Sequence, residues 1–268
     1  MDADARTVRY EVSAGVATIT LDRPQALNAL DPPTLAALRA AASQAANDEA
    51  ARAVLITGAG RAFCAGGDVK QMRAWTAAGA AASAAAVLDG AAVLHQAIST
   101  LYRLPKPVVC AVNGLVAGAG LGLALVADVA WAARSASFTL AYTALGLSPD
   151  GGTTFLLPRA VGPALAAELF LTNRSLDAEE AQRCGLVARV LDDEALAGEA
   201  QALARRLAQG PTRAYAELRA LLRGSGLHGL ETQLELERLA IGRSARSADF
   251  VEGVAALAER RAPRFRGD

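Results

Sequence analysis

Apolar residues in the first half of the chain gather in short runs, and longer stretches with helical or small-residue patterns separate them. Three runs are apolar almost throughout and predict buried strands: residues 53–58, 107–112 and 128–133. Residues 8–12 and 16–21 flank Ala14 and Gly15 and predict a hairpin. Because the stretches between the buried runs are long enough for helical crossovers, the pattern predicts parallel pairing and an α/β fold.

Helical patterns fill most of the remaining first half. Asp31 can cap a helix that has Pro32 in its first turn. A second helix, at about residues 88–103, should end before Pro105. Residues 76–86 are almost all alanine, glycine and serine: they could form a helix, but no large side chain anchors them, so they are also a candidate mobile segment.

The last third of the chain is helical in pattern, with one candidate strand at residues 186–191. We therefore divide the chain into a core, residues 1–200, and a helical C-terminal region, residues 201–268. In that region Phe250, Val254 and Leu257 form an apolar face of the kind that packs on another subunit.

Composition narrows the possible functions. The 27 basic residues balance the 27 acidic ones, which argues against a nucleic-acid surface. The three cysteines form no Cys-x-x-Cys pair, which indicates reduced thiols in the cytoplasm and no zinc site. No apolar run is long enough to cross a membrane, and the polar residues 1–6 do not resemble a signal peptide.

Two glycine-rich loops, residues 58–68 and 113–122, each follow a buried run and precede a helical pattern. In a parallel sheet both would open at the carboxyl edge, where ligands bind. Their N–H groups would form an oxyanion hole, each donor contributing ~3 kcal/mol to the transition state. Close helix packing would also favour small residues here. A dinucleotide site does not fit, because Asp128 comes too early, and neither a Walker lysine nor a Gly-x-Ser-x-Gly elbow is present.

Few side chains suggest acid–base chemistry. Asp150 lies in the turn Ser-Pro-Asp-Gly-Gly, where an aspartate commonly has only a turn or capping role. His95 lies on a predicted helix with an apolar face, and by itself it is more typical of a packed or surface histidine.

Several motifs in order along the chain resemble the crotonase (enoyl-CoA hydratase/isomerase) superfamily. The resemblance rests on Arg-Pro with Asn-Ala-Leu at 23–30, Gly-Arg-Ala-Phe-Cys-Ala-Gly-Gly-Asp at 60–68, Lys-Pro-Val with Asn-Gly and the glycine run at 106–122, the turn at 146–152, and residues 171–190. It covers nearly the whole chain.

The resemblance implies a repeated ββα spiral core with a helical C-terminal trimerisation region, assembled as a homotrimer or as a hexamer built from two trimers. It also implies an acyl-CoA substrate with no metal or redox cofactor, coenzyme A being part of the substrate. The oxyanion donors would be the N–H groups of Gly67 and Ala119. Further residues would bind the substrate along the groove for coenzyme A and the acyl group: Gln25, Ala26, Leu27, Ala65, Gly66, Asp68, Val69, Lys70, Gly118, Tyr142 and His95.

The catalytic positions depart from the hydratase pattern. Hydratases of the family carry two glutamates where this chain has Gly122 and Tyr142. Because hydration needs both carboxylates to activate water and deliver a proton, their absence argues against it. Asp150 matches instead the single base of enoyl-CoA isomerases and of the epoxyphenylacetyl-CoA isomerases of phenylacetate breakdown. We therefore expect a 3-enoyl to 2-enoyl isomerase of fatty acid metabolism, or an enzyme that rearranges a ring-epoxide aryl-CoA.

Two alternatives remain open. Halobenzoyl-CoA dehalogenases of the same superfamily also place an aspartate at position 150, where it acts as a nucleophile. Tyr142 and His95 match their aromatic and histidine positions, although Ser148-Pro149 is closer to the isomerases. The loss of both glutamates would also suit a non-catalytic acyl-CoA binder or a hydratase-like protein with another mechanism.

Overall fold

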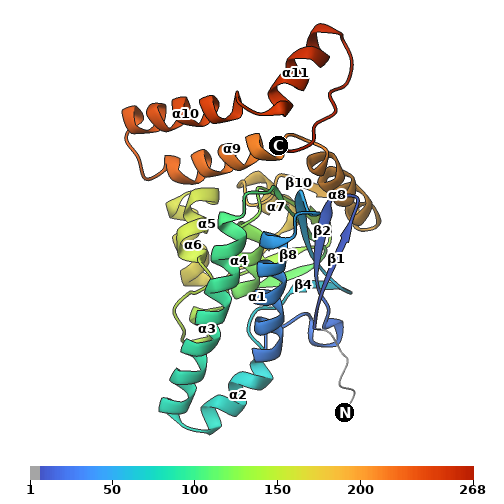
Figure 1. The fold of residues 1–268 in the computed structure, drawn as a ribbon. Coiled ribbons are helices and arrows are strands. Elements are labelled where there is room, and N and C mark those ends of the chain that lie inside the picture. Colours follow the sequence, from blue (N-terminus) through green and yellow to red (C-terminus); the bar gives the residue numbers. More distant parts are fainter. Residues whose placement is uncertain (1–6) are drawn as a thin grey trace.

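The computed structural model describes residues 7–268 (Figure 1). The residues before Thr7, which contributed the expectation of no signal peptide, lie outside this range. Two sheets form the centre. The larger sheet has six strands, in the order β1 (Val8–Ser13), β2 (Val16–Leu21), β3 (Ala53–Gly58), β5 (Val108–Val112), β7 (Val129–Ala133) and β10 (Arg189–Leu191). The smaller sheet has four, in the order β4 (Ala62–Cys64), β6 (Leu115–Ala117), β8 (Ser137–Thr139) and β9 (Leu176–Asp177).

The pairing confirms the predicted α/β class and the predicted hairpin. Strands β1 and β2 are antiparallel, whereas β2, β3, β5, β7 and β10 pair in parallel. The parallel strands β3 and β5 are almost wholly buried, because helices cover both faces of the sheet. Because β3 and β5 are parallel, their carboxyl ends lie at the same edge of the sheet. Each is followed along the chain by a short strand of the smaller sheet.

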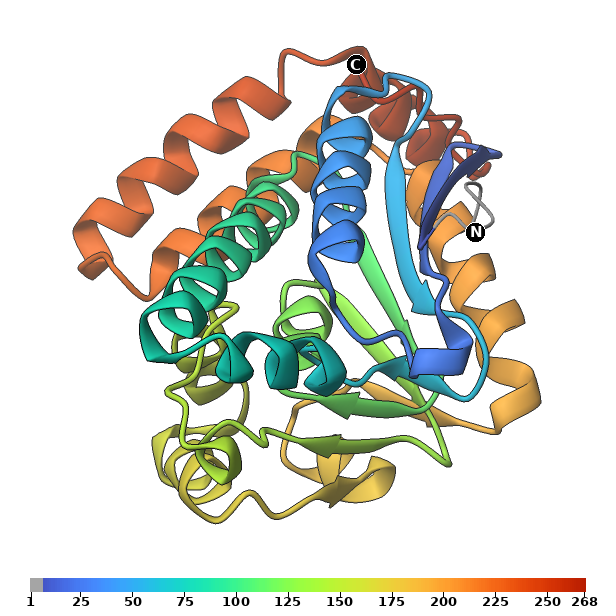
Figure 2. The ribbon, with the colours of Figure 1, turned by 90° about the horizontal axis from the view of Figure 1, so that it is seen from below.

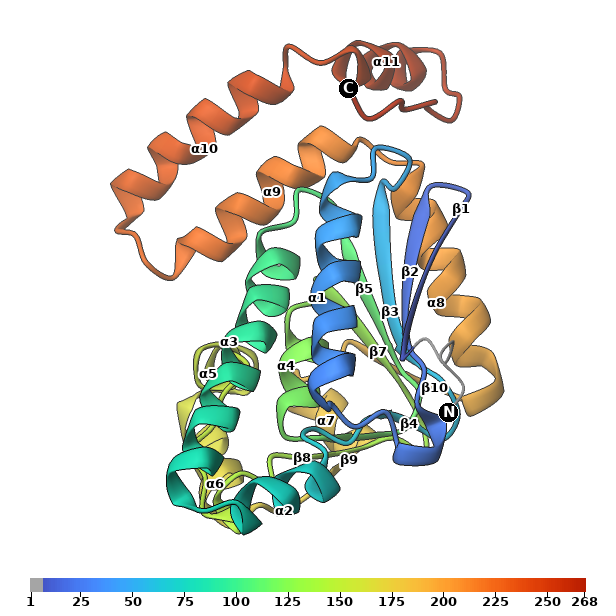
Figure 3. The same cartoon turned by 60° about the horizontal axis from the view of Figure 1, so that its bottom comes forward.

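The described part of the chain has these α-helices: α1 (Pro32–Asn47), α2 (Val69–Ala77), α3 (Ala80–Arg103), α4 (Ala119–Leu125), α5 (Thr153–Val161), α6 (Pro163–Thr172), α7 (Ala178–Arg183), α8 (Asp193–Ala208), α9 (Thr212–Ser225), α10 (Leu230–Ser244) and α11 (Ala248–Ala258). Figures 2 and 3 show α1 and α3 on one side of the larger sheet and α8 on the other. As predicted, the Asp31 side chain caps α1, accepting a hydrogen bond of 2.9 Å from the Thr34 N–H.

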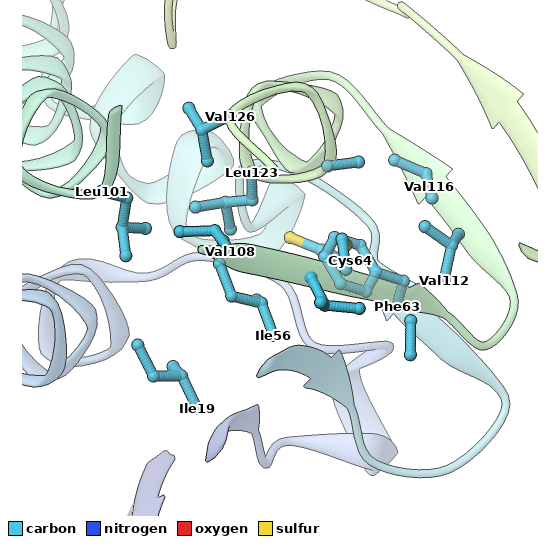
Figure 4. Packing of buried hydrophobic residues seen from close by; sticks show 14 of the residues in the cluster. Ile19, Ile56, Phe63, Cys64, Leu101, Val108, Val112, Val116, Leu123 and Val126 are labelled. Atoms are coloured by element: carbon cyan, nitrogen blue, oxygen red, sulfur yellow. The ribbon is translucent and has the colours of Figure 1, made fainter. Parts of the chain in front are cut away.

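The hydrophobic core lies where the two sheets meet. Figure 4 shows Phe63 and Cys64 of β4 packed between Val112 of β5 and Leu123 of α4. All four side chains are inaccessible to solvent. Burial raises the pKa of the Cys64 thiol to about 12, so it remains protonated at neutral pH. The glycine-rich loops therefore adjoin fully buried strands, β4 and β5.

Helix α3 differs from the prediction in two ways. It begins at Ala80 rather than near residue 88, and it includes most of the alanine-rich segment 76–86, where we expected either a helix or a mobile segment, because alanine has the strongest helix propensity. It is also the one described helix with the length and hydropathy of a membrane span, whereas the sequence showed no such run. Its apolar stripe, including Leu94, Ile98 and Leu101, is buried in the core, and the helix packs closely on α1.

The helical C-terminal part projects from this body. Helix α8 runs through the predicted division at residue 200 and packs on β3, β5 and β7, so the projecting part begins after Ala208. Helices α9 and α10 pack against each other, and α11 follows (Figure 1). Phe250, Val254 and Leu257 are 53%, 55% and 82% exposed, so the predicted apolar face of α11 is uncovered in the single chain.

Candidate active site

The two glycine-rich loops touch each other at the carboxyl edge of the sheet. Gly66 has a φ of +80°, and a Cβ added there would lie 2.7 Å from the Ala117 carbonyl oxygen and 3.5 Å from the Ala119 nitrogen. Only glycine allows this close approach of backbone to backbone. The predicted pairing of the two loops is thus present in the fold.

The N–H groups of Gly67 and Ala119 are available to a ligand. Ala119 is the first residue of α4, so its N–H has no acceptor within the helix. Gly118, with a φ of +50°, turns the chain into that helix and donates its own N–H to Thr139. Among residues 7–268, neither Gly67 nor Ala119 donates a hydrogen bond to another loop or side chain. Two such donors suit an oxyanion hole.

An ion-pair network holds the first loop in place. The Arg23 guanidinium lies 3.1 Å from Asp31 and 3.2 Å from Asp68. The other oxygen of Asp68 caps α2 by accepting from the Lys70 N–H at 3.0 Å. The Asp68 carboxylate therefore positions the loop that carries Gly67. The sequence included Arg23 in a motif but gave no sign of this role, because its partners are distant in the chain.

The predicted groove segments lie side by side. The Ala65 N–H donates to the Leu27 carbonyl at 3.0 Å, and the Leu30 N–H donates to the Gly66 carbonyl at 2.7 Å. The segment of residues 25–27 therefore borders the segment of residues 65–70. Val69 and Lys70 are exposed at the start of α2. Their contact with coenzyme A stays a prediction.

Asp150 is held by its neighbours in a turn before α5. The Tyr142 hydroxyl donates to Asp150 Oδ1 at 2.8 Å, and Thr153 donates to the Asp150 carbonyl through both its hydroxyl and its N–H. Burial and the adjacent carboxylate raise the pKa of Tyr142, so its hydroxyl stays protonated and keeps donating. Within residues 7–268, Asp150 Oδ2 accepts no hydrogen bond, which leaves one oxygen for a substrate proton.

His95 of α3 also contacts this turn. The Gly151 N–H donates to His95 Nε2 at 3.2 Å. The lone pair of Nε2 is therefore occupied, and a neutral imidazole with this bond carries its proton on Nδ1. The structure thus brings Asp150, Tyr142 and His95 together, with His95 supporting the turn through the backbone.

The turn reaches the second glycine-rich loop as well. A Cβ added to Gly151 would lie 3.7 Å from the Ala119 carbonyl oxygen. The carboxylate of Asp150 is therefore carried on a turn that packs against α4, the helix whose first residue, Ala119, has an N–H available to a ligand. Such a pairing of one base with two N–H donors suits proton transfer next to a carbonyl group.

An apolar hollow of 260 Å³ opens beside this turn. Ile98 and Tyr102 of α3 line one side, and Phe155 of α5 lines the other. The rings of Tyr102 and Phe155 meet edge to face with their centroids 6.2 Å apart.

Within residues 7–268, no three His, Cys, Asp or Glu side chains are grouped as a metal site would need.

Comparison with known proteins identifies the family of this chain. The sequence profile of the enoyl-CoA hydratase/isomerase family matches residues 11–268. The chain is 43% identical to a 1,2-epoxyphenylacetyl-CoA isomerase of Escherichia coli over 96% of its length and 97% of that protein. It is 42% identical to a Rhodobacter capsulatus protein named "Probable enoyl-CoA hydratase", over 97% and 98%. The crystal structure of an enoyl-CoA hydratase from Bacillus anthracis superposes with a TM-score of 0.91 at 31% identity, over 98% and 100%.

Proposed function

We propose that this chain, which belongs to the enoyl-CoA hydratase/isomerase (crotonase) family, is an acyl-CoA isomerase that uses a single carboxylate base. The observation that carries the proposal is the position of Asp150, held through Oδ1 by Tyr142 on a turn that packs against α4. No carboxylate stands at position 122 or 142, where the family's hydratases have theirs. The arrangement supports moving one proton rather than adding water.

In the proposed mechanism, the thioester oxygen lies between the N–H groups of Gly67 and Ala119. Asp150 removes a proton from the carbon next to the thioester carbonyl, and the electron pair moves onto the thioester oxygen as an enolate. The two N–H groups stabilise that charge. The protonated Asp150 then returns its proton two carbons further along the acyl chain, so the double bond moves from the 3- to the 2-position.

The proposed substrates are a 3-enoyl-CoA or a ring-epoxide aryl-CoA. The relative named 1,2-epoxyphenylacetyl-CoA isomerase supports the second class, and with it a place in phenylacetate catabolism. The hollow between α3 and α5 offers apolar space for the acyl or aryl group beside Asp150. We also infer a homotrimer or hexamer from the exposed apolar face of α11, and a cytoplasmic enzyme from its three free cysteines.

Replacing Asp150 tests the proposal. We expect Asp150→Asn to lower kcat for conversion of a 3-enoyl-CoA to the 2-enoyl form by about 10²–10⁴-fold, because the amide cannot accept the proton. The amide is nearly the same size as the carboxylate, so KM should change little. The assay follows formation of the conjugated thioester by absorbance. Undiminished turnover in the variant would rule out Asp150 as the base.

Other measurements separate the alternatives. A dehalogenase would release halide from a para-halobenzoyl-CoA and would stall at an aryl ester on Asp150 when His95 is replaced by glutamine. The Gly151 N–H already occupies Nε2 of His95, which disfavours a role for this histidine as a base. A non-catalytic binder would take up coenzyme A thioesters without exchanging the proton next to the carbonyl in heavy water.

A further inference from the structure

Gly122 lies in α4 against the turn that carries Asp150. A Cβ added at this position would overlap the carbonyl oxygen of Gly151 and lie 3.2 Å from its carbonyl carbon. The obstacle is backbone, so it cannot rotate aside as a side chain could. Gly122 itself is buried in the middle of the short helix. Any side chain at position 122 must therefore move either α4 or the turn.

The turn is held on its other side by α3. Gly151 has a φ of +60°, and a Cβ on it would lie 3.4 Å from the Leu94 side chain of α3. Its N–H is bound to His95 of the same helix. Residue 151 thus lies between α3, where His95 accepts its N–H, and α4, where its carbonyl group meets Gly122.

Helix α4 is equally constrained on its other side. A Cβ on Gly120 would lie 2.5 Å from the Cys64 carbonyl oxygen, so this residue is pressed against β4. The helix therefore cannot retreat from the turn without disturbing the loop that leads to Gly67. Because Asp150 is bonded to Gly151, the catalytic carboxylate is the group that moves when room is made at position 122.

We propose that Gly122 is a specificity-determining residue. Because it has no side chain, the Asp150 turn packs directly against α4 and fills the space that a hydratase glutamate at position 122 would need. In this chain the acid at position 122 and the seated base at position 150 exclude each other sterically. Loss of the first hydratase glutamate is thus part of the construction that positions Asp150. The inference rests on the proposed isomerase function.

The test adds the smallest possible side chain. We expect Gly122→Ala to lower kcat for 3-enoyl-CoA isomerisation by about 100-fold, as a misplacement of about 1 Å can do, with little change in KM. The crystal structure of the variant should show the Gly151 carbonyl displaced from α4. Gly198→Ala is the matched control. This glycine also lies inside a helix, with no atom within 4 Å of an added Cβ, so the activity of the Gly198→Ala variant should equal that of the wild type.

Two further measurements test for hydration, the addition of water to a 2-enoyl-CoA. Gly122→Glu restores the hydratase residue, and we expect it to lose isomerisation without gaining hydration of a 2-enoyl-CoA. The wild type should form little 3-hydroxyacyl-CoA from a 2-enoyl-CoA, a result that does not depend on the variants folding. Efficient hydration by Gly122→Glu or by the wild type would overturn the proposal, as would wild-type kcat and an unmoved turn in Gly122→Ala.

The outcomes distinguish this inference from the proposed function. If the wild type neither isomerises a 3-enoyl-CoA nor exchanges the proton next to the carbonyl, the isomerase assignment fails. The steric part of the inference is then still decided by the position of Gly151 in the Gly122→Ala crystal structure.

Discussion

Asp150 owes its orientation to two neighbours that supply no carboxylate. Tyr142 donates a hydrogen bond to one carboxylate oxygen, and His95 holds the following peptide group through Gly151. Hydrogen bonds to a charged group contribute about 1.5–3 kcal/mol. The phenol at position 142 therefore has a specific use in this site and does more than replace a glutamate.

Removing the Tyr142 hydroxyl tests that use. We expect Tyr142→Phe to lower kcat for isomerisation roughly tenfold, because Asp150 loses the partner that fixes Oδ1 and each 1.4 kcal/mol corresponds to a factor of ten. Steady-state kinetics with a 3-enoyl-CoA provides the measurement. Tyr215→Phe, in α9 and remote from Asp150 in the chain, serves as the control. Equal rates in the two variants would show that the Tyr142 hydrogen bond is unimportant.

At the scale of the elements, α9 is attached to the sheet by two arginines that share the Asp128 carboxylate: the buried Arg219 and, at 3.1 Å, Arg223. Arg219 is 5% exposed, donates to the carbonyls of Leu104 and Lys106, and lies 2.7 Å from the Asp128 carboxylate. Asp128 also accepts from the Val108 N–H at 2.7 Å. The projecting helix is thereby joined to β5, the strand that leads into the second glycine-rich loop.

This connection predicts that alanine replacements at two aspartates differ in their effect on the stability of the protein. Asp128→Ala should lower the free energy of unfolding by roughly 3 kcal/mol, because it leaves the charge of Arg219 buried without its partner. Asp192, which pairs with Arg134 on the surface, is the control, and its replacement by alanine should have little effect. Urea unfolding of both variants at one protein concentration checks the prediction. Equal midpoints for the two would contradict the role of the buried pair.

At the scale of the whole molecule, the projecting C-terminal helices expose apolar side chains. Leu230 and Ile241 of α10 are 68% and 70% exposed, in addition to the apolar face of α11. Exposed apolar surfaces that exceed those of ordinary monomers commonly mark contacts with other chains. A cyclic assembly of identical chains would cover it.

The molar mass of the protein in solution tests the proposed assembly. Light scattering with size-exclusion chromatography should give about three times the 27.5 kDa of one chain, or a dimer of that trimer. Leu257→Asp on α11 should reduce the mass, because it places a charge in the apolar contact. Leu171→Asp on α6 is the control, since Leu171 is similarly exposed but lies outside the projecting helices. A monomeric wild type would refute the proposed assembly.

Much of this architecture could be predicted from local patterns. The apolar runs at 53–58 and 107–112 became β3 and β5 because such runs can be buried only inside a covered sheet, and Asp31 caps α1 through a contact three residues away. Ordered motifs along the chain, compared with a known family, indicated the oxyanion donors and Asp150. The start of α3 was missed because the alanine-rich stretch has helix propensity without a large apolar anchor.

What the sequence determined by itself was therefore the fold class, the two glycine-rich loops and the identity of the candidate base. Only the tertiary structure decided that Asp68 binds Arg23, that His95 accepts a hydrogen bond from the Asp150 turn, and that the Gly151 carbonyl fills the space beside Gly122. These contacts join residues far apart in the chain, and backbone atoms that look the same in every residue supply several of them. A residue pattern records which side chains are present, whereas the room around Gly122 depends on how three separate segments pack.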